Sequence, residues 1–363
     1  MTEPTTNGVV PAVKATQVHK AFGSLHVLKG VDMTVMPGSV TVILGPSGSG
    51  KSTFLRLINQ LETLTGGEID VDGEMIGYKY VDKDGKQVLQ TLNDKEVAEQ
   101  RSKLGMVFQR FNLFPHMTAL ENVMEAPVHV KHMDKKEARK LAIEELNRVG
   151  MGDRLDHYPA QLSGGQQQRT ALARVLAYEP AALLLDEPFS AMDAYLKERL
   201  RLELKKTLSE YEGVSVMVTH DRDEAFQLCD HLLLMEQGRV IAAGETKAVF
   251  ADPGTWQAAR LTGCKNLSRI EKIGSRKIRA LDWDGLELVT AQEVGDEIEA
   301  VGIRAHDFEP LSSGEALEWE KREDANLIPV EDAEISEMPF EWYVTMKNHL
   351  WWKLEKTIHV HES

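Results

Sequence analysis

Residues 45–52 read Gly-Pro-Ser-Gly-Ser-Gly-Lys-Ser, a spacing of glycines, lysine and hydroxyl that is typical of a phosphate-binding loop. The glycines let backbone N–H groups approach phosphate oxygens without side-chain obstruction. We expect the lysine to neutralise terminal phosphates, the serine hydroxyl after it to ligate magnesium, and the next threonine to contact the α-phosphate side. The predicted binding residues are Gly45, Pro46, Ser47, Gly48, Ser49, Gly50, Lys51, Ser52 and Thr53.

A pair of carboxylates follows an apolar run at residues 181–185. Asp186 ends a predicted buried strand, so its carboxylate would emerge beside the loop and hold magnesium through the water shell of the ion. Glu187 is the candidate general base for an attacking water. Alone, an apolar run that ends in Asp-Glu-Pro is more often a plain strand end. Its occurrence after a phosphate loop favours the catalytic interpretation.

Three further residues fit a nucleotide site, each with an ordinary alternative. His220 ends the apolar run 214–219, where its imidazole could bind the terminal phosphate and orient Glu187, or simply lie on a polar surface. Gln109 follows the short apolar run 106–108 and could contact magnesium or the water, or be a loop glutamine. Phe22 could stack on an aromatic base or be a core residue.

A second glycine motif occurs at residues 162–166, Leu-Ser-Gly-Gly-Gln. The Gln-rich run 166–174 that follows it has the composition of a helix, and a helix N-terminus favours an anion. Ser163, Gly164, Gly165 and Gln166 are therefore predicted phosphate contacts. An ordinary Ser/Gly helix cap is the alternative for this motif taken alone.

Composition and length restrict the class of protein. The chain has 363 residues, 57 acidic against 42 basic residues and a net charge of -15, which argues against nonspecific binding of nucleic acid. The first residues lack the pattern of a signal peptide, and no apolar run reaches 18 residues, so we expect a cytoplasmic location. Cys229 and Cys264 are too few for a disulfide framework or a complete zinc site.

The pattern of apolar and β-branched segments along the chain predicts an α/β domain followed by a small β-rich domain. β-branched runs at 13–18, 31–35 and 40–44 indicate strands, and helical spacing at 53–61 follows the loop. Hairpins are predicted around Asp72-Gly73, Asp84-Gly85 and Gln237-Gly238. The predicted boundaries are a disordered tail at 1–13, a domain that contains the phosphate loop at 14–260 with a helical insert at 112–168, and the β-rich domain at 265–363.

These motifs, in this order, resemble the ATP-binding cassette (ABC) family over residues 14 to 250. The resemblance implies a P-loop NTPase fold: a RecA-like core with an antiparallel β subdomain and a helical insert. It implies ATP and Mg²⁺ as ligands, and two cassettes that close head to tail, so that Ser163 and Gly165 complete the site of a second copy. Asp193 would couple the two sites across the interface. The partners implied are an integral membrane permease at the cytoplasmic face of the plasma membrane and, indirectly, an extracytoplasmic solute-binding protein.

Finer resemblances point to two subfamilies. The segment 107–127 resembles cassettes of polar amino-acid importers, whereas 186–193 and 219–225 resemble sulfate and molybdate importers. The C-terminal region resembles the oligonucleotide-binding-like β domain of molybdate-type cassettes and would bind an oxyanion or extend a homodimer interface. Arg304 and His306 are its candidate anion ligands, with solvated strand-end charges as the alternative. The segment after Gln109 would face the permease, so polar amino acids are placed ahead of oxyanions.

Two other function classes compete with transport. A soluble ABC protein that acts on ribosomes or DNA typically has two cassettes or a long coiled coil, and neither is found in this sequence. A small-molecule kinase built on a phosphate loop would not need the motif at 162–166. The sequence therefore favours an ATP hydrolase that powers import.

Overall fold

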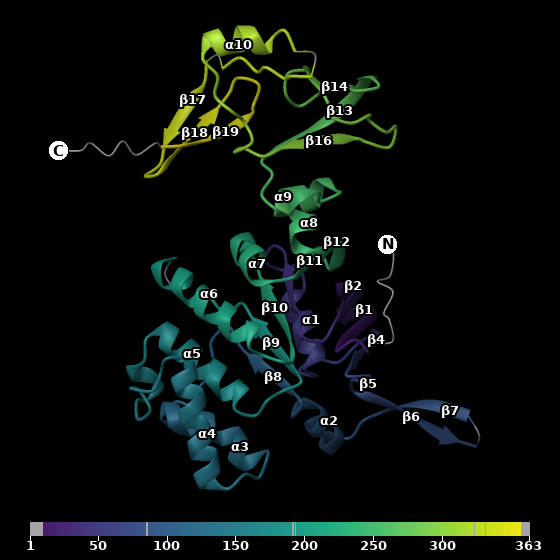
Figure 1. Cartoon of the computed structure of the whole chain (residues 1–363). Coiled ribbons are helices and arrows are strands. Elements are labelled where there is room, and N and C mark those ends of the chain that lie inside the picture. The colour runs from purple at the N-terminus through teal and green to yellow at the C-terminus, as the bar shows by residue number, and fades with distance from the viewer. Residues whose placement is uncertain are drawn as a thin grey trace, which may run out of the picture. The chain divides into compact units, whose positions relative to one another are not determined.

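The chain forms two compact units, Met1–Ala251 and Asp252–Ser363, in a computed structural model (Figure 1). The structure describes residues 10–356 except Gly85, Ala191, Asp193, Glu323 and Glu331. Most of the predicted tail lies outside the described residues, whereas Ala12 and Val13 are buried. No described helix is both long and apolar enough to cross a bilayer.

A six-stranded sheet organises the first unit, with strand order β12-β11-β3-β10-β9-β8. The strands from β11 to β8 run parallel, and β12 pairs antiparallel at the edge. Nearly every residue of β3, β9 and β10 is buried, which explains their continuous apolar sequences. The bounds are β3 Val40–Leu44, β8 Leu104–Val107, β9 Ala182–Asp186, β10 Val214–Thr219, β11 His231–Glu236 and β12 Arg239–Glu245.

An antiparallel sheet of order β2-β1-β4-β5 packs on the other side of helix α1 (Lys51–Ile58). Phe54, Leu55 and Ile58 of this helix are fully buried in a core that includes residues of both sheets. The β4–β5 turn forms at Asp72 and Gly73, both with positive φ, as the Asp-Gly pair predicts. The bounds are β1 Val13–Phe22, β2 Leu25–Val35, β4 Gly66–Val71 and β5 Glu74–Met75.

A two-stranded hairpin and short helices complete the first unit. The hairpin of β6 (Tyr78–Lys83) and β7 (Lys86–Thr91) projects from the unit in Figure 1. Helix α6 (Ala194–Ser209) lies between β9 and β10 in the chain. The remaining helices are α2 Asp94–Arg101, α7 Arg222–Leu228 and α8 Thr246–Ala251.

The helical insert lies between β8 and β9 and extends past residue 168, its predicted end. It contains α3 (Ala119–His129), α4 (Lys135–Arg148), the 3₁₀ turn η1 (Pro159–Gln161) and α5 (Gly164–Leu176). The three α-helices pack on one another, and α5 also packs on β8. In Figure 1 they gather beside the β8 edge of the central sheet.

Asn122 of α3 fixes the segment that enters this insert. Its side chain is fully buried, and its Oδ1 accepts from the backbone N–H of Phe114 at 2.8 Å. Its Nδ2 lies within 3.1 Å of the carbonyl oxygens of Phe114, Met117 and Thr118. One side chain thus satisfies several buried backbone groups of a non-helical segment.

The second unit is rich in β structure. It starts with α9 (Trp256–Leu261) and contains a four-stranded sheet of order β15-β14-β13-β16 and a three-stranded sheet of order β17-β18-β19. Trp283, Met346 and Leu350 are buried in its core. The bounds are β13 Asn266–Gly274, β14 Lys277–Ala280, β15 Leu286–Val289, β16 Ala300–Ile303, α10 Ser313–Trp319, β17 Glu334–Glu337, β18 Glu341–Thr345 and β19 Trp351–Glu355.

Replacing Asn122 with alanine tests the role of its buried amide. We expect Asn122→Ala to lower the free energy of unfolding by about 2 kcal/mol, because buried backbone groups lose their partners. Urea unfolding of both proteins measures the change. Arg139→Ala, at an exposed position of α4, should change stability by less than about 0.5 kcal/mol. Equal stability of the two variants would contradict the role assigned to Asn122.

Candidate functional site

The phosphate loop connects β3 to α1, the setting that such a motif requires. Gly48 has φ 80 and Gly50 has φ 100, in the left-handed region that favours glycine. A Cβ at Gly45 would lie 2.1 Å from the carbonyl oxygen of Met235, so the loop packs directly on β11. Gly50 caps α1 without a side-chain bond, which leaves the helix N-terminus to the loop's ligand.

Lys51 is folded into this loop. Its Nζ donates to the carbonyl oxygens of Gly45 at 2.8 Å and Pro46 at 3.0 Å, and the residue is only 4% exposed. Burial lowers the pKa of Lys51, while the charges of Glu187 and Asp186 oppose that shift. An ammonium group that has already lost most of its water interacts strongly with an anion in the loop.

Asp186, at the end of β9, reaches the start of α1. Its Oδ1 accepts from the Ser52 hydroxyl at 2.6 Å, although the two residues are far apart in the sequence. Burial raises the pKa of Asp186, and the bond from Ser52 partly offsets the rise. The structure therefore brings together two of the three residues predicted to hold magnesium, Ser52 and Asp186 but not Gln109.

Glu187 and His220 face each other at the same edge of the sheet. His220 Nδ1 lies 3.3 Å from Glu187 Oε2, as expected for a histidine that orients the carboxylate. The backbone N–H of Glu187 donates to the carbonyl oxygen of Val218 at 3.0 Å, and its φ of 45° is unusual for a residue other than glycine. Such backbone geometry clusters at functional sites, where the surrounding structure holds it in place.

Gln109 and Phe22 are both exposed and lie at ends of strands. Gln109 follows β8, the neighbour of β9, but no described hydrogen bond joins its side chain to Asp186 or Glu187. Phe22 ends β1 and is 45% exposed, so the core alternative for this aromatic is wrong. The Lys20 ammonium lies 4.5 Å from the ring centroid of Phe22. One face of the ring is thus engaged by a cation.

The motif at 162–166 forms the start of α5. Ser163 is its N-cap: its Oγ accepts from Gln166 N at 3.4 Å, and its own N–H donates to Gln166 Oε1 at 2.9 Å. The predicted residues Gly164 and Gly165 are the first two of the helix. Because α5 packs on α3, α4 and β8, the described contacts do not place this motif at the chain's own phosphate loop. The predicted contact Asp193 lies outside the described residues.

Arg174 is a positioning residue that the sequence analysis did not single out. It lies on α5, and its guanidinium donates to the carbonyl oxygens of Asn112 at 2.7 Å and Phe111 at 3.1 Å. This residue therefore ties the helix of the 162–166 motif to the segment after Gln109. An arginine among the apolar residues of α5 is the sequence signal for this contact, but its partner depends on the fold.

These groups suit the binding of a nucleoside triphosphate together with magnesium. The loop offers backbone N–H groups, a desolvated ammonium and a helix N-terminus, and the oxygens of Ser52 and Asp186 are hard ligands. The described residues include no cluster of three or more His, Cys, Asp or Glu that could hold a metal. Phosphate oxygens and water would thus have to complete the magnesium shell.

Comparison with known proteins identifies relatives that match the first unit of this chain. A family model described as ABC transporter matches residues 28–190. The arginine transport ATP-binding protein ArgV of Corynebacterium glutamicum is 47% identical over 241 residues, which cover 66% of this chain and 93% of that protein. The glutamine transport ATP-binding protein GlnQ of Escherichia coli is 43% identical over 66% of this chain and 94% of that protein.

Solved structures agree with these relatives. The cassette cbiO1 of Clostridium perfringens, part of the ABC transporter complex cbiONQ, has a TM-score of 0.58 at 30% identity and covers 69% of this chain and 93% of its own. The dimeric ATP-binding cassette MJ0796, bound to ADP and Pi, has a TM-score of 0.55 at 37% identity and covers 64% of this chain and 98% of its own.

The buried carboxylate of Asp186 predicts a measurable cost in stability. Since burial raises its folded pKa, the ionised form destabilises the fold at pH 7.5, and Asp186→Asn should raise the free energy of unfolding. The gain should shrink as pH falls through the raised pKa, because the wild-type carboxyl then becomes neutral. Urea unfolding at pH 7.5 and 4.5 measures both effects.

Asp153→Asn serves as the matched control, since the Asp153 side chain is 71% exposed. Its stability should follow that of the wild type at both pH values. A loss of stability in Asp186→Asn at pH 7.5 would show that Lys51 and Arg56 stabilise the carboxylate more than burial destabilises it.

Proposed function

This chain belongs to the ABC transporter family, and we propose that it hydrolyses ATP to drive import of a polar amino acid through a membrane permease. The Ser52–Asp186 and Glu187–His220 contacts at one sheet edge support the hydrolytic site. The cargo class rests on relatives named for transport of arginine and glutamine, which align over more than 90% of their length. The C-terminal resemblance to molybdate-type cassettes stays a prediction.

The loop residues would bind the triphosphate of ATP. Backbone N–H groups between Gly45 and Thr53 surround the phosphate oxygens, and Lys51 exchanges its two backbone carbonyl partners for phosphate oxygens. Ser52 would hold magnesium directly and Asp186 through water, and the bound ion would supply positive charge beside the phosphates. Phe22 offers the free face of its ring to the adenine.

Glu187 would act as the general base. Its carboxylate takes a proton from the attacking water, and His220 holds that carboxylate while its other ring nitrogen is available to the terminal phosphate. The anchored backbone of Glu187 fixes the position of the carboxylate relative to the loop. Gln109, just after β8, would contact magnesium or the attacking water once nucleotide is bound. This contact would couple nucleotide binding to the position of the helical insert.

A second copy of the chain would complete each ATP site. The motif at 162–166 has its own stable cap but no described contact with the loop of its own chain. The MJ0796 cassette, which shares this fold, is dimeric. Ser163, Gly164, Gly165 and Gln166 would therefore contact the phosphates held by the loop of the partner, and Asp193 would lie at the same interface.

The permease would receive the motion of this dimer at the cytoplasmic face of the membrane. Closure on ATP and opening after hydrolysis shift the population of two dimer states, and the helical insert with the segment after Gln109 transmits that shift. An extracytoplasmic solute-binding protein would deliver the amino acid to the permease. Arg174 and Asn122 hold this transmitting segment in shape.

Replacing the base with its amide should separate binding from hydrolysis. We expect Glu187→Gln to lower the rate of phosphate release at least 100-fold, a loss that matches the typical contribution of a general base. ATP affinity should stay within about threefold, because Lys51, Ser52 and Asp186 are unchanged. Phosphate release and equilibrium binding of a labelled nucleotide measure the two effects.

The same variant tests whether ATP induces a dimer. With ATP, Glu187→Gln should double in mass by light scattering, whereas the double variant Glu187→Gln, Ser163→Arg should bind ATP and stay monomeric. Glu137→Gln, at an exposed position of α4, is the matched control and should hydrolyse ATP like the wild type. An unchanged rate in Glu187→Gln would remove Glu187 as the base.

Uptake by cells tests the cargo class. Loss of this chain should reduce uptake of labelled arginine, glutamine or glutamate at least fivefold, and molybdate uptake should be unchanged. The wild-type chain should restore uptake, and Glu187→Gln should not. A defect confined to molybdate or sulfate would overturn the amino-acid assignment while leaving ATP hydrolysis intact.

A further inference from the structure

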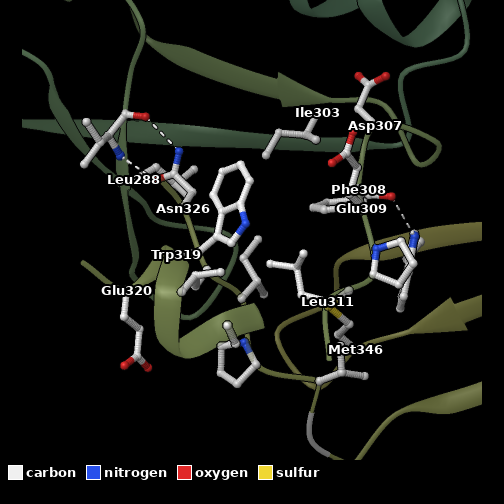
Figure 2. A pocket seen from close by; sticks show the side chains of 18 of the residues that line it. Leu288, Ile303, Asp307, Phe308, Glu309, Leu311, Trp319, Glu320, Asn326 and Met346 are labelled. Carbon is white, nitrogen blue, oxygen red and sulfur yellow. Dashed lines mark hydrogen bonds between the residues drawn. The ribbon is translucent and has the colours of Figure 1, made fainter. Parts of the chain in front are cut away.

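The second unit contains a cavity of about 980 Å³, open to solvent, that the proposed transport cycle does not use. Its lining comes from the four-stranded sheet, the segment after β16, helix α10 and the segment 326–330. Figure 2 shows lining side chains from these elements around a common space. A volume of this size lies at the upper end of the range for small-molecule sites, about 300–1,000 Å³.

The lining is mainly apolar and aromatic. Ile303, Leu288 and Met346 contribute aliphatic surface, and Phe308 and Trp319 contribute rings. In Figure 2 the indole of Trp319 stands among the other labelled side chains. Trp319 is 37% exposed, and the Arg322 guanidinium lies 4.4 Å from the centroid of its ring, so one face of the indole is already covered by a cation. Such a surface favours a ligand with an apolar body.

Two polar contacts fix the shape of the lining. Asn326 pairs with the backbone of Val289: its Oδ1 accepts from Val289 N at 2.7 Å, and its Nδ2 donates to Val289 O at 2.8 Å. The indole nitrogen of Trp352 donates to the carbonyl oxygen of Phe308 at 3.2 Å. The segments on opposite sides of the cavity are thus held to the sheets, which makes the site preformed.

The charges of the lining have one sign. Asp307, Glu309 and Glu320 line the cavity, and the described lining includes no lysine, arginine or histidine. Asp307 has a neighbour in His306, at 3.4 Å, whereas Glu309 forms no ion pair with any residue that the structure describes. An anion in this cavity would meet these carboxylates, and the Arg322 guanidinium beside the Trp319 ring is already paired with Asp324 at 3.2 Å.

The cations predicted to bind an oxyanion have other partners. Arg304 donates through its guanidinium to the carbonyl oxygen of Thr262 at 2.9 Å, and neither Arg304 nor His306 lines the cavity. The cavity thus differs in charge from the oxyanion site that these two residues suggested. A free amino acid also fits poorly, since its carboxylate would meet no cationic residue in the described lining.

We propose that this cavity binds a small organic cation with an apolar body, such as an aryl-alkyl amine. The apolar body packs against Trp319, Phe308 and the aliphatic lining, and the cationic group faces Glu309 and Asp307. This ligand is distinct from the transported solute and from ATP.

Calorimetric titration of the full-length chain with two probes of similar shape tests the charge preference. Tryptamine is cationic at pH 7.5, whereas indole-3-propionate has an anionic group on the same ring. We expect tryptamine to bind with one site per chain at least tenfold more tightly than indole-3-propionate, and molybdate to give no heat at millimolar concentration.

Substitutions locate the site. Trp319→Ala should weaken tryptamine about tenfold, because it removes the exposed ring of the lining. Glu309→Gln should weaken tryptamine about fivefold and leave indole-3-propionate unchanged or tighter. Glu318→Gln is the matched control, because Glu318 is exposed on α10 and does not line the cavity. It should bind tryptamine like the wild type.

Two readouts keep these variants interpretable. Each variant should keep the ATP affinity and melting temperature of the wild type, which shows that both units remain folded. Equal affinity for the two indole probes, tryptamine binding that survives Trp319→Ala, or binding of neither probe would overturn the proposal. Since ATP binding and uptake are measured separately, these outcomes leave the proposed transport function untouched.

Discussion

The parallel register of β3, β10 and β9 is the constraint on which the nucleotide site depends. Leu44 pairs with Thr219, and Val218 pairs with Asp186, so three strands end at one edge of the sheet. The phosphate loop, Glu187 and His220 are the next residues along those strands. The 2.6 Å contact between Ser52 and Asp186 follows from this alignment, because a slip of one residue would turn Asp186 to the other face.

The central strands could be predicted from sequence because they are buried on both faces. Residues 40–44 and 214–219 are continuous apolar runs, and β3 and β10 have those bounds. Contacts between distant segments could not be predicted in this way. The bonds from Arg174 to Phe111 and Asn112 join residues about 60 positions apart, and no local pattern specifies such a pair.

The second unit shows another limit of prediction from sequence. Its β-rich character follows from short alternating segments, but its cavity combines residues from Ile278 to Trp352, whose mutual positions depend on how two sheets pack. Arg304 and His306 suggested an anion site because the sequence shows that these residues can carry positive charge. It does not show which groups they contact in the fold. In the fold, one donates to Thr262 and the other pairs with Asp307. The relatives' matches cover about two thirds of this chain, so they offer little guidance for the rest.

The cap of α5 has a kinetic consequence for assembly. Ser163 and Gln166 satisfy each other's backbone groups within one chain, so the helix N-terminus is ordered before any second copy arrives. The entropy cost of association would then come mainly from the lost rotation and translation of the two copies, because no loop has to become ordered. In the proposed dimer, the encounter of two copies would therefore be limited by orientation and diffusion, and the lifetime of the pair would be set by the nucleotide between them.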